Sequence, residues 1–205
     1  MKINYIPLGT RCSSAFVIRD NFKKRECSLP FDWLDMPITA ITNFLSFGPL
    51  EIDEKIDEYF KELGTGHKHT DGTWFPHDIE FIDKTWKLKT ETKDKFLKRL
   101  KRFNDLIQTE NNFFLFLTVI LEKGMYKTED FNKLKELIDS KVHNCAFITI
   151  NLGHESDFQF NNHFNLSIPQ LEVDPGLKEW EKIIYENIES HAGIKKYIEE
   201  NGGDI

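Results

Sequence analysis

The chain of 205 residues has few cysteines, no excess of positive charge and no apolar run long enough to cross a membrane. Its three cysteines, Cys12, Cys27 and Cys145, are too few and too scattered for a disulfide framework, and an odd number fits reduced thiols. The apolar run at 113–121 is much shorter than the ~20 residues that a transmembrane helix needs. Because no apolar signal core follows Met1, the sequence predicts an intracellular protein with no membrane partner.

The charge balance argues against a nucleic-acid partner, and the histidines give only a weak signal for a metal site. A net charge of −7 repels nucleic acid and anionic membranes, although a local basic patch could still hold a small anion. His67 and His69 lie in the glycine-rich segment 64–72, which the sequence predicts to be a mobile loop. Two histidines alone are a weak signal for a metal. We therefore expect no nucleic-acid partner, no metal site and no cofactor.

Strand and helix patterns alternate along the chain, most regularly after residue 90. Continuous apolar runs at 113–121 and 145–152 are typical of strands that are covered on both faces. Pro169 interrupts a further strand, which therefore belongs at a sheet edge. Apolar residues at helical spacing predict helices at 92–107, from 128 onward and at 176–189. This order predicts an α/β fold, with a mainly parallel sheet that has helices on both faces.

Length and composition fit one domain. A chain of 205 residues with 40% hydrophobic and 13% aromatic residues can bury a densely packed core. We expect residues 1–192 to form this single α/β domain. Residues 193–205, which end in glycines, are predicted to form a frayed C-terminal tail.

Cys12 lies at the predicted start of the first helix. Residues 5–9 form a predicted strand, residues 10–12 a turn, and residues 13–19 the helix that follows. Unpaired backbone N–H groups and the helix dipole favour negative charge at such a position, and Arg11 adds to the same field. A field of this kind lowers the pKa of a cysteine and makes its thiolate a nucleophile at neutral pH. The alternative is a small buried residue that packs the helix start.

Three segments of the sequence resemble a known family. They are Leu8-Gly9-Thr10-Arg11-Cys12-Ser13-Ser14-Ala15, Ser28-Leu29-Pro30-Phe31-Asp32-Trp33 and Phe75-Pro76-His77-Asp78, in this order. Together with a basic stretch at 99–103, they resemble the papain-like cysteine peptidase family, a domain family of unknown function. The resemblance covers the first half of the chain, and it implies a Cys–His hydrolase with Cys12 as the nucleophile and His77 as the base. Papain-like peptidases pack the cysteine helix on an antiparallel barrel, whereas the pattern here predicts a parallel sheet.

Two carboxylates are candidates to orient the histidine or to exchange protons. Asp78 directly follows His77, and Asp32 is flanked by two aromatic residues, so its surroundings are partly apolar. A buried carboxylate must be paired or have a raised pKa. The alternative for Asp32 is a helix or turn cap that accepts hydrogen bonds from backbone N–H groups ahead of the following helix. His154, at the end of a predicted strand, is a second candidate histidine.

A rival interpretation rests on positive charge. Lys95, Arg99 and Arg102 lie at three- and four-residue spacing, so a helix places them on neighbouring rows. Such a run is usually a solvated face, but arginine also binds a phosphate or carboxylate through two parallel hydrogen bonds. The turn that contains Gly9 and Arg11 could hold the same anion at a helix start.

The sequence thus leaves two main classes of function open. The first, which we favour, is a peptidase or related thiol hydrolase that uses Cys12, His77 and either Asp32 or Asp78. The second is a transferase or binding domain for an anionic ligand such as a sugar phosphate, in which Cys12 is incidental. Trp33 is expected to contact the ligand if its indole is exposed. The expected partner is a peptide or a small anionic substrate. The sequence leaves the oligomeric state open, and also a third class, an interaction module without catalytic activity.

Overall fold

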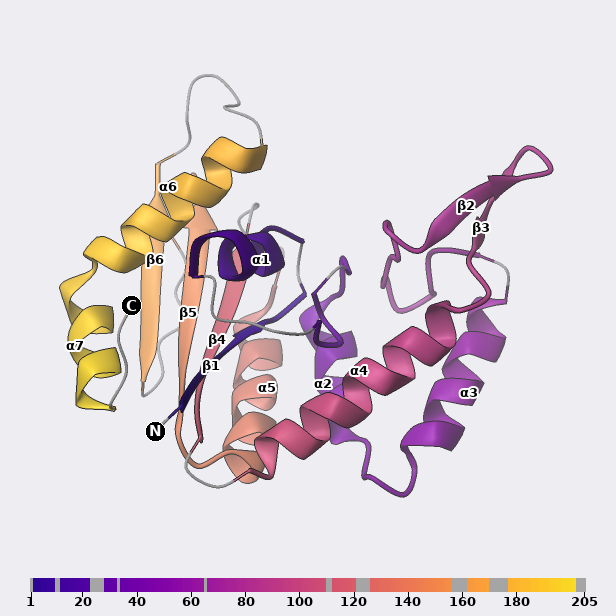
Figure 1. Cartoon of the computed structure of the whole chain (residues 1–205), viewed down its shortest axis with the longest axis horizontal. Coiled ribbons are helices and arrows are strands. Elements are labelled where there is room, and N and C mark those ends of the chain that lie inside the picture. The colour runs from indigo at the N-terminus through magenta and orange to yellow at the C-terminus, as the bar shows by residue number, and fades with distance from the viewer. Residues whose placement is uncertain are drawn as a thin grey trace.

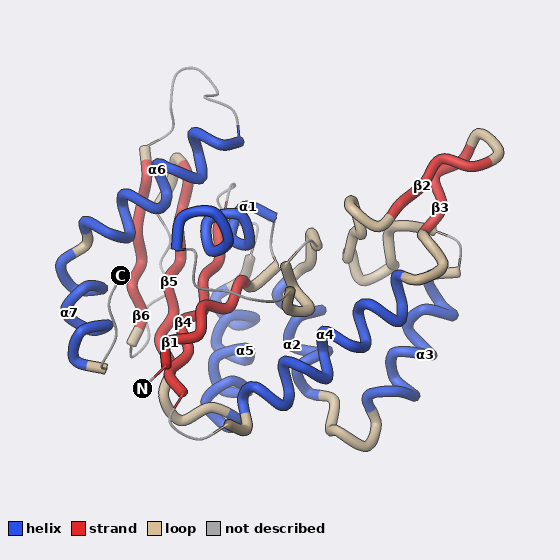
Figure 2. Tube along the Cα trace, in the orientation of Figure 1, coloured by secondary structure: helices blue, strands red, loops and turns tan. Residues whose placement is uncertain are grey.

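Four parallel strands form the centre of the molecule (Figure 1 and Figure 2). Their order across the sheet is β1 (Lys2–Pro7), β4 (Asn112–Ile120), β5 (Cys145–Leu152) and β6 (His163–Ile168). Every neighbouring pair runs parallel, and β1 begins with Lys2 opposite Asn112. The computed structural model describes residues 2–9, 12–22, 28–32, 34–64, 66–109, 112–120, 126–155, 162–169 and 177–201.

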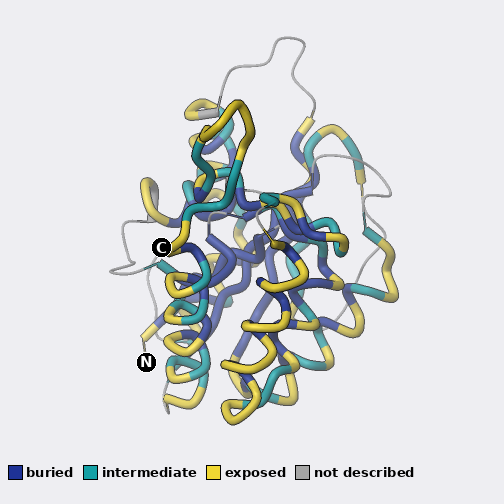
Figure 3. Tube along the Cα trace, turned by 90° about the vertical axis from the view of Figure 1, so that its right-hand side faces the viewer, coloured by how far each residue is buried: buried dark blue, intermediate teal, exposed yellow. Residues whose placement is uncertain are grey.

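Helices cover both faces of the sheet, which lies buried between them (Figure 3). The core on one side includes residues of α2 (Ile38–Ser46), α3 (Ile52–Leu63), α4 (Thr92–Ile107) and α5 (Thr128–Lys141). On the other side lie α1 (Cys12–Phe16), the π-helix η1 (Val17–Phe22), α6 (Leu177–Ser190) and α7 (Ala192–Glu200). Alternate residues of β4 serve the two cores, Phe114 and Phe116 the first and Phe113 and Leu115 the second. The predicted α/β fold, a parallel sheet with helices on both faces, is confirmed.

Several boundaries match the sequence pattern, but the C-terminal tail differs from it. Helix α4 spans 92–107 as predicted, whereas the tail predicted to fray after residue 192 forms α7. Ile194 and Ile198 lie four residues apart on one face of α7, and both are fully buried. Nδ1 of His191 accepts a hydrogen bond from the N–H of Ile194 (3.2 Å), which caps the helix start. Burial and this cap outweigh the weak local signal of the tail.

A β-hairpin projects from the molecule on the side away from α6 (Figure 1). It consists of β2 (Ile79–Ile82) and β3 (Thr85–Leu88), which pair antiparallel. Asp83 and Lys84 form its turn with positive φ angles of 51° and 63°. Such turns are usually marked by glycine, so the sequence carried no signal for this hairpin. The hairpin carries the exposed rings of Phe81 and Trp86, whose centroids lie 5.1 Å apart.

The glycine-rich segment 64–72, expected to be a mobile loop, contains a closed turn that packs against α3. The N–H of His69 donates to the C=O of Thr73 (2.8 Å), and the N–H of Gly72 donates to the C=O of His69 (3.0 Å). The buried His69 ring stacks on Tyr59, with ring centroids 3.9 Å apart. Within the described residues, no group of three or more histidines, cysteines or carboxylates could hold a metal ion.

The described helices are short by the standard of a membrane span. The longest, α4, has 16 residues. In the part of the chain that the structure describes, no helix is both long enough and apolar enough to cross a bilayer.

We expect Ile198→Ala to lower the free energy of unfolding by about 2–5 kcal/mol, because it removes a large part of a fully buried side chain. Lys195→Ala on the exposed side of the same helix is the control, and it should change stability by less than about 0.5 kcal/mol. Urea denaturation of both variants measures the difference. Equal losses in the two variants would mean that α7 does not pack on the core.

Candidate functional site

Three segments of the chain meet near the carboxyl end of β1. The C=O of Gly9 accepts a hydrogen bond from the N–H of Met36 (2.6 Å). Asp35 and Trp74 exchange two backbone hydrogen bonds, of 3.1 Å and 2.8 Å. The end of β1, residues 28–36 and the segment that leads to His77 are therefore joined one to the next, although they are far apart in the sequence.

Gly9 is required at its position because Phe31 lies directly against it. A Cβ atom at residue 9 would lie 2.5 Å from the carbonyl oxygen of Phe31 and 3.1 Å from its Cβ. The N–H of Leu8 donates to the C=O of Leu117 (2.8 Å), which extends the pairing of β1 with β4 up to this point. The sequence interpretation assigned Gly9 to an anion. Close packing against Phe31 accounts for the glycine without one.

Asp32 is completely buried in the segment that packs on Gly9. Its Oδ2 atom accepts a hydrogen bond from the N–H of Leu29 (2.8 Å), and its own N–H donates to the C=O of Leu29 (3.4 Å). The carboxylate therefore closes its own turn. This is the turn cap that the sequence left open for Asp32, whereas α2 has Pro37 at its N-cap and no side-chain cap.

His77 and Asp78 lie at the base of the hairpin and have different surroundings. His77 is exposed, whereas Asp78 is buried. The side-chain carboxylate of Asp78 lies 3.7 Å from Nζ of Lys95. The backbone C=O of Asp78 accepts hydrogen bonds from the N–H of Lys89 (2.9 Å) and the hydroxyl of Thr92 (3.5 Å). Asp78 therefore attaches the hairpin to the start of α4, and these contacts explain its burial.

Cys12 is the first residue of α1, in agreement with the position predicted for it. The helical turns continue through η1, whose π-helical form the sequence did not indicate. Arg11 and Trp33 lie outside the described residues, as does the side chain of Cys12. That the Cys12 thiol and the imidazole of His77 lie within reach of each other therefore stays a prediction.

The basic character of α4 has a structural cause in its acidic neighbour α3. Nζ of Lys93 lies 2.8 Å from Oδ1 of Asp57, and Nζ of Lys101 lies 2.7 Å from Oδ1 of Asp53. All four side chains are largely exposed, so each pair contributes little to stability. The pairs connect α3 to α4 and occupy two of the cations of α4.

Arg99 and Arg102, which the sequence interpretation treated together, are not equivalent. Nη1 of Arg102 donates to the C=O of Ser28 (2.7 Å), so this arginine holds the buried turn that contains Asp32. Arg99 is half-buried, and it has no hydrogen-bond or ion-pair partner among the residues that the structure describes. Only Arg99 of these two is thus available to a ligand without loss of a structural contact.

The carboxyl end of β5 carries polar groups that the sequence interpretation recognised only in part. Asn151, which it missed, is fully buried, and its Nδ2 donates to Oδ1 of Asn165 (2.5 Å) and to the C=O of Leu166 (3.1 Å). Both ring nitrogens of the second candidate histidine, His154, are buried and have no hydrogen-bond partner within the described ranges. An asparagine in an otherwise apolar strand was the available sequence signal for this polar end.

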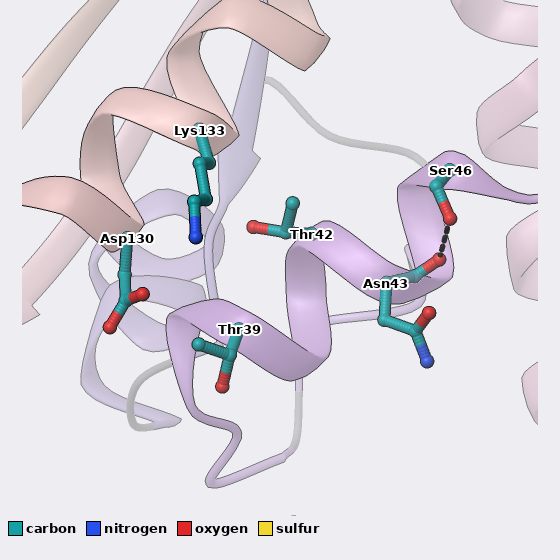
Figure 4. A pocket seen from close by; sticks show the side chains of 6 residues that line it. All are labelled: Thr39, Thr42, Asn43, Ser46, Asp130 and Lys133. Carbon is teal, nitrogen blue, oxygen red and sulfur yellow. Dashed lines mark hydrogen bonds between the residues drawn. The ribbon is translucent and has the colours of Figure 1, made fainter.

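A pocket of about 340 Å³ lies between α2 and α5 (Figure 4). Its lining residues are Thr39, Thr42, Asn43, Ser46, Asp130 and Lys133. The α2 residues repeat at helical spacing on the face opposite the apolar one, which is also typical of a solvated face. In Figure 4 the ammonium group of Lys133 points into the space between the helices. This pocket could hold a small polar molecule, but none of the predicted site residues lines it.

Comparisons of the chain with family models, curated proteins and solved structures found no match. The papain-like resemblance of the three segments therefore stays an expectation.

We expect Gly9→Ala to destabilise the protein by about 1–3 kcal/mol, because the added methyl group overlaps the Phe31 carbonyl and the backbone must move. Gly48→Ala is the matched control, since its methyl group would meet only Glu51 Oε2, at 3.5 Å. Chemical denaturation tests both variants. If Gly9→Ala were as stable as Gly48→Ala, the close approach of the two segments would be wrong.

We expect iodoacetamide to label Cys12 faster than Cys145 in the folded protein. Burial raises the pKa of the Cys145 thiol to about 12, so almost no thiolate forms there near neutral pH. Mass-spectrometric mapping of the labelled peptides at pH 6 to 9 measures the two rates. Labelling of Cys145 at the rate of Cys12 or faster would contradict an activated thiol at Cys12.

Proposed function

We propose that the chain is a thiol-dependent hydrolase of the Cys–His type, a peptidase or a relative, with Cys12 as the nucleophile and His77 as the base. The meeting of three distant segments at the end of β1 supports this most strongly. Nothing in the local sequence requires the neighbourhoods of Gly9, Asp35 and Trp74 to be adjacent. Each segment carries or adjoins one residue type that the chemistry needs: a thiol, a carboxylate or an imidazole.

The proposed reaction is two successive acyl transfers. The Cys12 thiol gives its proton to His77 and attacks the acyl carbon, while backbone N–H groups at the start of α1 hydrogen-bond to the oxyanion. The leaving group takes the proton from the imidazolium as the carbon–leaving-group bond breaks, and a thioester remains. Water, deprotonated by the imidazole, then attacks the thioester, releases the acid and restores the thiol.

The contacts of the two carboxylates support positioning roles rather than proton transfer. Asp32 closes its turn through the N–H of Leu29, and this turn packs on the backbone three residues before Cys12. Asp78 connects the segment that carries His77 to α4 through Lys95. Both carboxylates therefore hold the segments whose mutual position the reaction depends on.

A second candidate is a transferase or binding domain for a small anion such as a sugar phosphate, with Cys12 incidental. The half-buried Arg99, which has no partner among the described residues, favours it. The two candidates differ in what happens when the thiol is removed. Binding of an anion survives Cys12→Ser, whereas hydrolysis does not.

We expect Cys12→Ser and His77→Ala each to abolish thiol-dependent turnover, and the double variant to lose no more than either alone, because nucleophile and base act as one unit. The measurement is hydrolysis of p-nitrophenyl acetate and of a panel of peptide amides, with and without iodoacetamide treatment. Thermal unfolding of the three variants shows whether any loss of turnover comes from a loss of the fold.

Two matched variants control for general damage. Cys145→Ser removes the buried thiol, and His143→Ala removes an exposed imidazole at the far end of β5. Both should retain turnover. Hydrolysis that persists in Cys12→Ser, or falls equally in His143→Ala, would refute the assignment of Cys12 and His77.

A further inference from the structure

One face of α4 contacts two of the segments that meet at the proposed site, those of Asp78 and Ser28. Lys95, Arg99 and Arg102 lie on this face, because residues three and four apart on a helix are neighbours. At one end, Lys95 lies 3.7 Å from the carboxylate of Asp78. At the other end, Arg102 donates to the C=O of Ser28. Along the helix, Arg99 lies between Lys95, which contacts Asp78, and Arg102, which contacts Ser28.

The flanking cations of this face are already occupied. Lys95 also pairs with Glu91 at 3.1 Å, and Arg102 is committed to a backbone carbonyl. The remaining paired cations of α4, Lys93 and Lys101, are directed to α3. Arg99 is half-buried and, within the described residues, has neither an acidic nor a carbonyl partner. A partly desolvated guanidinium gains most from a charged, planar acceptor.

We propose that Arg99 binds an anionic group of the substrate, a carboxylate or a phosphate, while Lys95 and Arg102 hold the segments of Asp78 and Ser28. This inference rests on the proposed hydrolase and names its substrate class: an acyl compound that carries a second, negatively charged group. The reacting bond lies at Cys12 and the charge at Arg99. The molecule as a whole repels anions because its net charge is −7. A local cation is therefore needed to bind an anionic substrate.

The test compares Arg99→Gln with Lys98→Gln, which removes the same charge from an exposed position of the same helix. The probes are inorganic phosphate and succinate, so that phosphate and carboxylate recognition are told apart. Thermal unfolding with increasing probe reports binding, because a ligand that binds only the native state raises the melting temperature. The rate of Cys12 alkylation in the same samples reports whether the anion lies near the thiol.

We expect at least one probe to stabilise the unaltered protein and Lys98→Gln and to slow alkylation of Cys12 in both. Arg99→Gln should bind that probe about tenfold or more weakly, the loss expected for a hydrogen bond to a charged group. No stabilisation by either probe, or equal stabilisation of Arg99→Gln, would overturn the inference. Stabilisation that leaves alkylation of Cys12 unchanged would also overturn it, because the anion site would then be separate from the thiol.

A failure of the hydrolase would give a different result. If Cys12→Ser kept full turnover, the proposed function would fall, yet the loss of phosphate or succinate binding in Arg99→Gln would still be measurable. If turnover depended on Cys12 while both probes failed to bind, the hydrolase would stand and only the role of Arg99 would fall.

Discussion

The contact between the backbone of Gly9 and Phe31 is the constraint on which the rest of the site depends. Before this point the chain runs through β1, and after it α1 and η1 lie on one side of the sheet. Residues 28–36 then begin the core of the other side, where Leu29 and Phe31 are buried. The described chain therefore lies on one face of the sheet at residues 17–18 and on the other face from residue 29. Only a residue without a side chain permits the returning segment to lie this close.

Helix α4 connects the other segments of the same site. Its apolar side, with Phe96, Leu100 and Phe103, packs into the core on that side of the sheet. Its charged side reaches α3, the base of the hairpin and the turn of Asp32. A single helix thus sets the distances between three segments that have no strand pairing with the sheet. Lys93, Lys95, Lys101 and Arg102 have partners, whereas the half-buried Arg99 and the exposed Lys98 have none among the described residues.

Local patterns were sufficient for the elements that bury an unambiguous face. The run at 145–152 and the helix at 92–107 have the boundaries that their apolar spacing predicts. The hairpin was missed because the turn of Asp83 and Lys84 has none of the usual glycine. Helix α7 was missed because its stability comes from the burial of Ile194 and Ile198 against a distant core rather than from local propensity.

The candidate site was predictable in its residue types but not in its contacts. The start of a helix at Cys12 follows from a strand, a turn and an amphipathic segment. For Asp32 the sequence indicated a cap on a helix or a turn, and the structure shows the turn: the carboxylate accepts from the N–H of Leu29. The partner of Arg102 is a carbonyl in a segment far away in the sequence, and no local pattern indicates such a pairing. Long-range backbone contacts of this kind depend on how the whole chain closes.

The pairing of β1 with β4 has a consequence for how the protein folds. Lys2 lies opposite Asn112, so β1 has no neighbour among the described strands of this sheet until the residues from 112 onward have been made. Closing so long a loop between parallel strands is slow, because its entropic cost precedes the gain from the contacts. Strands β4, β5 and β6 follow one another closely and can associate sooner. The end of β1, with Gly9 and the start of α1, is therefore among the last parts of the molecule to reach its place, and a nascent or truncated chain would hold a folded sheet before it holds a site.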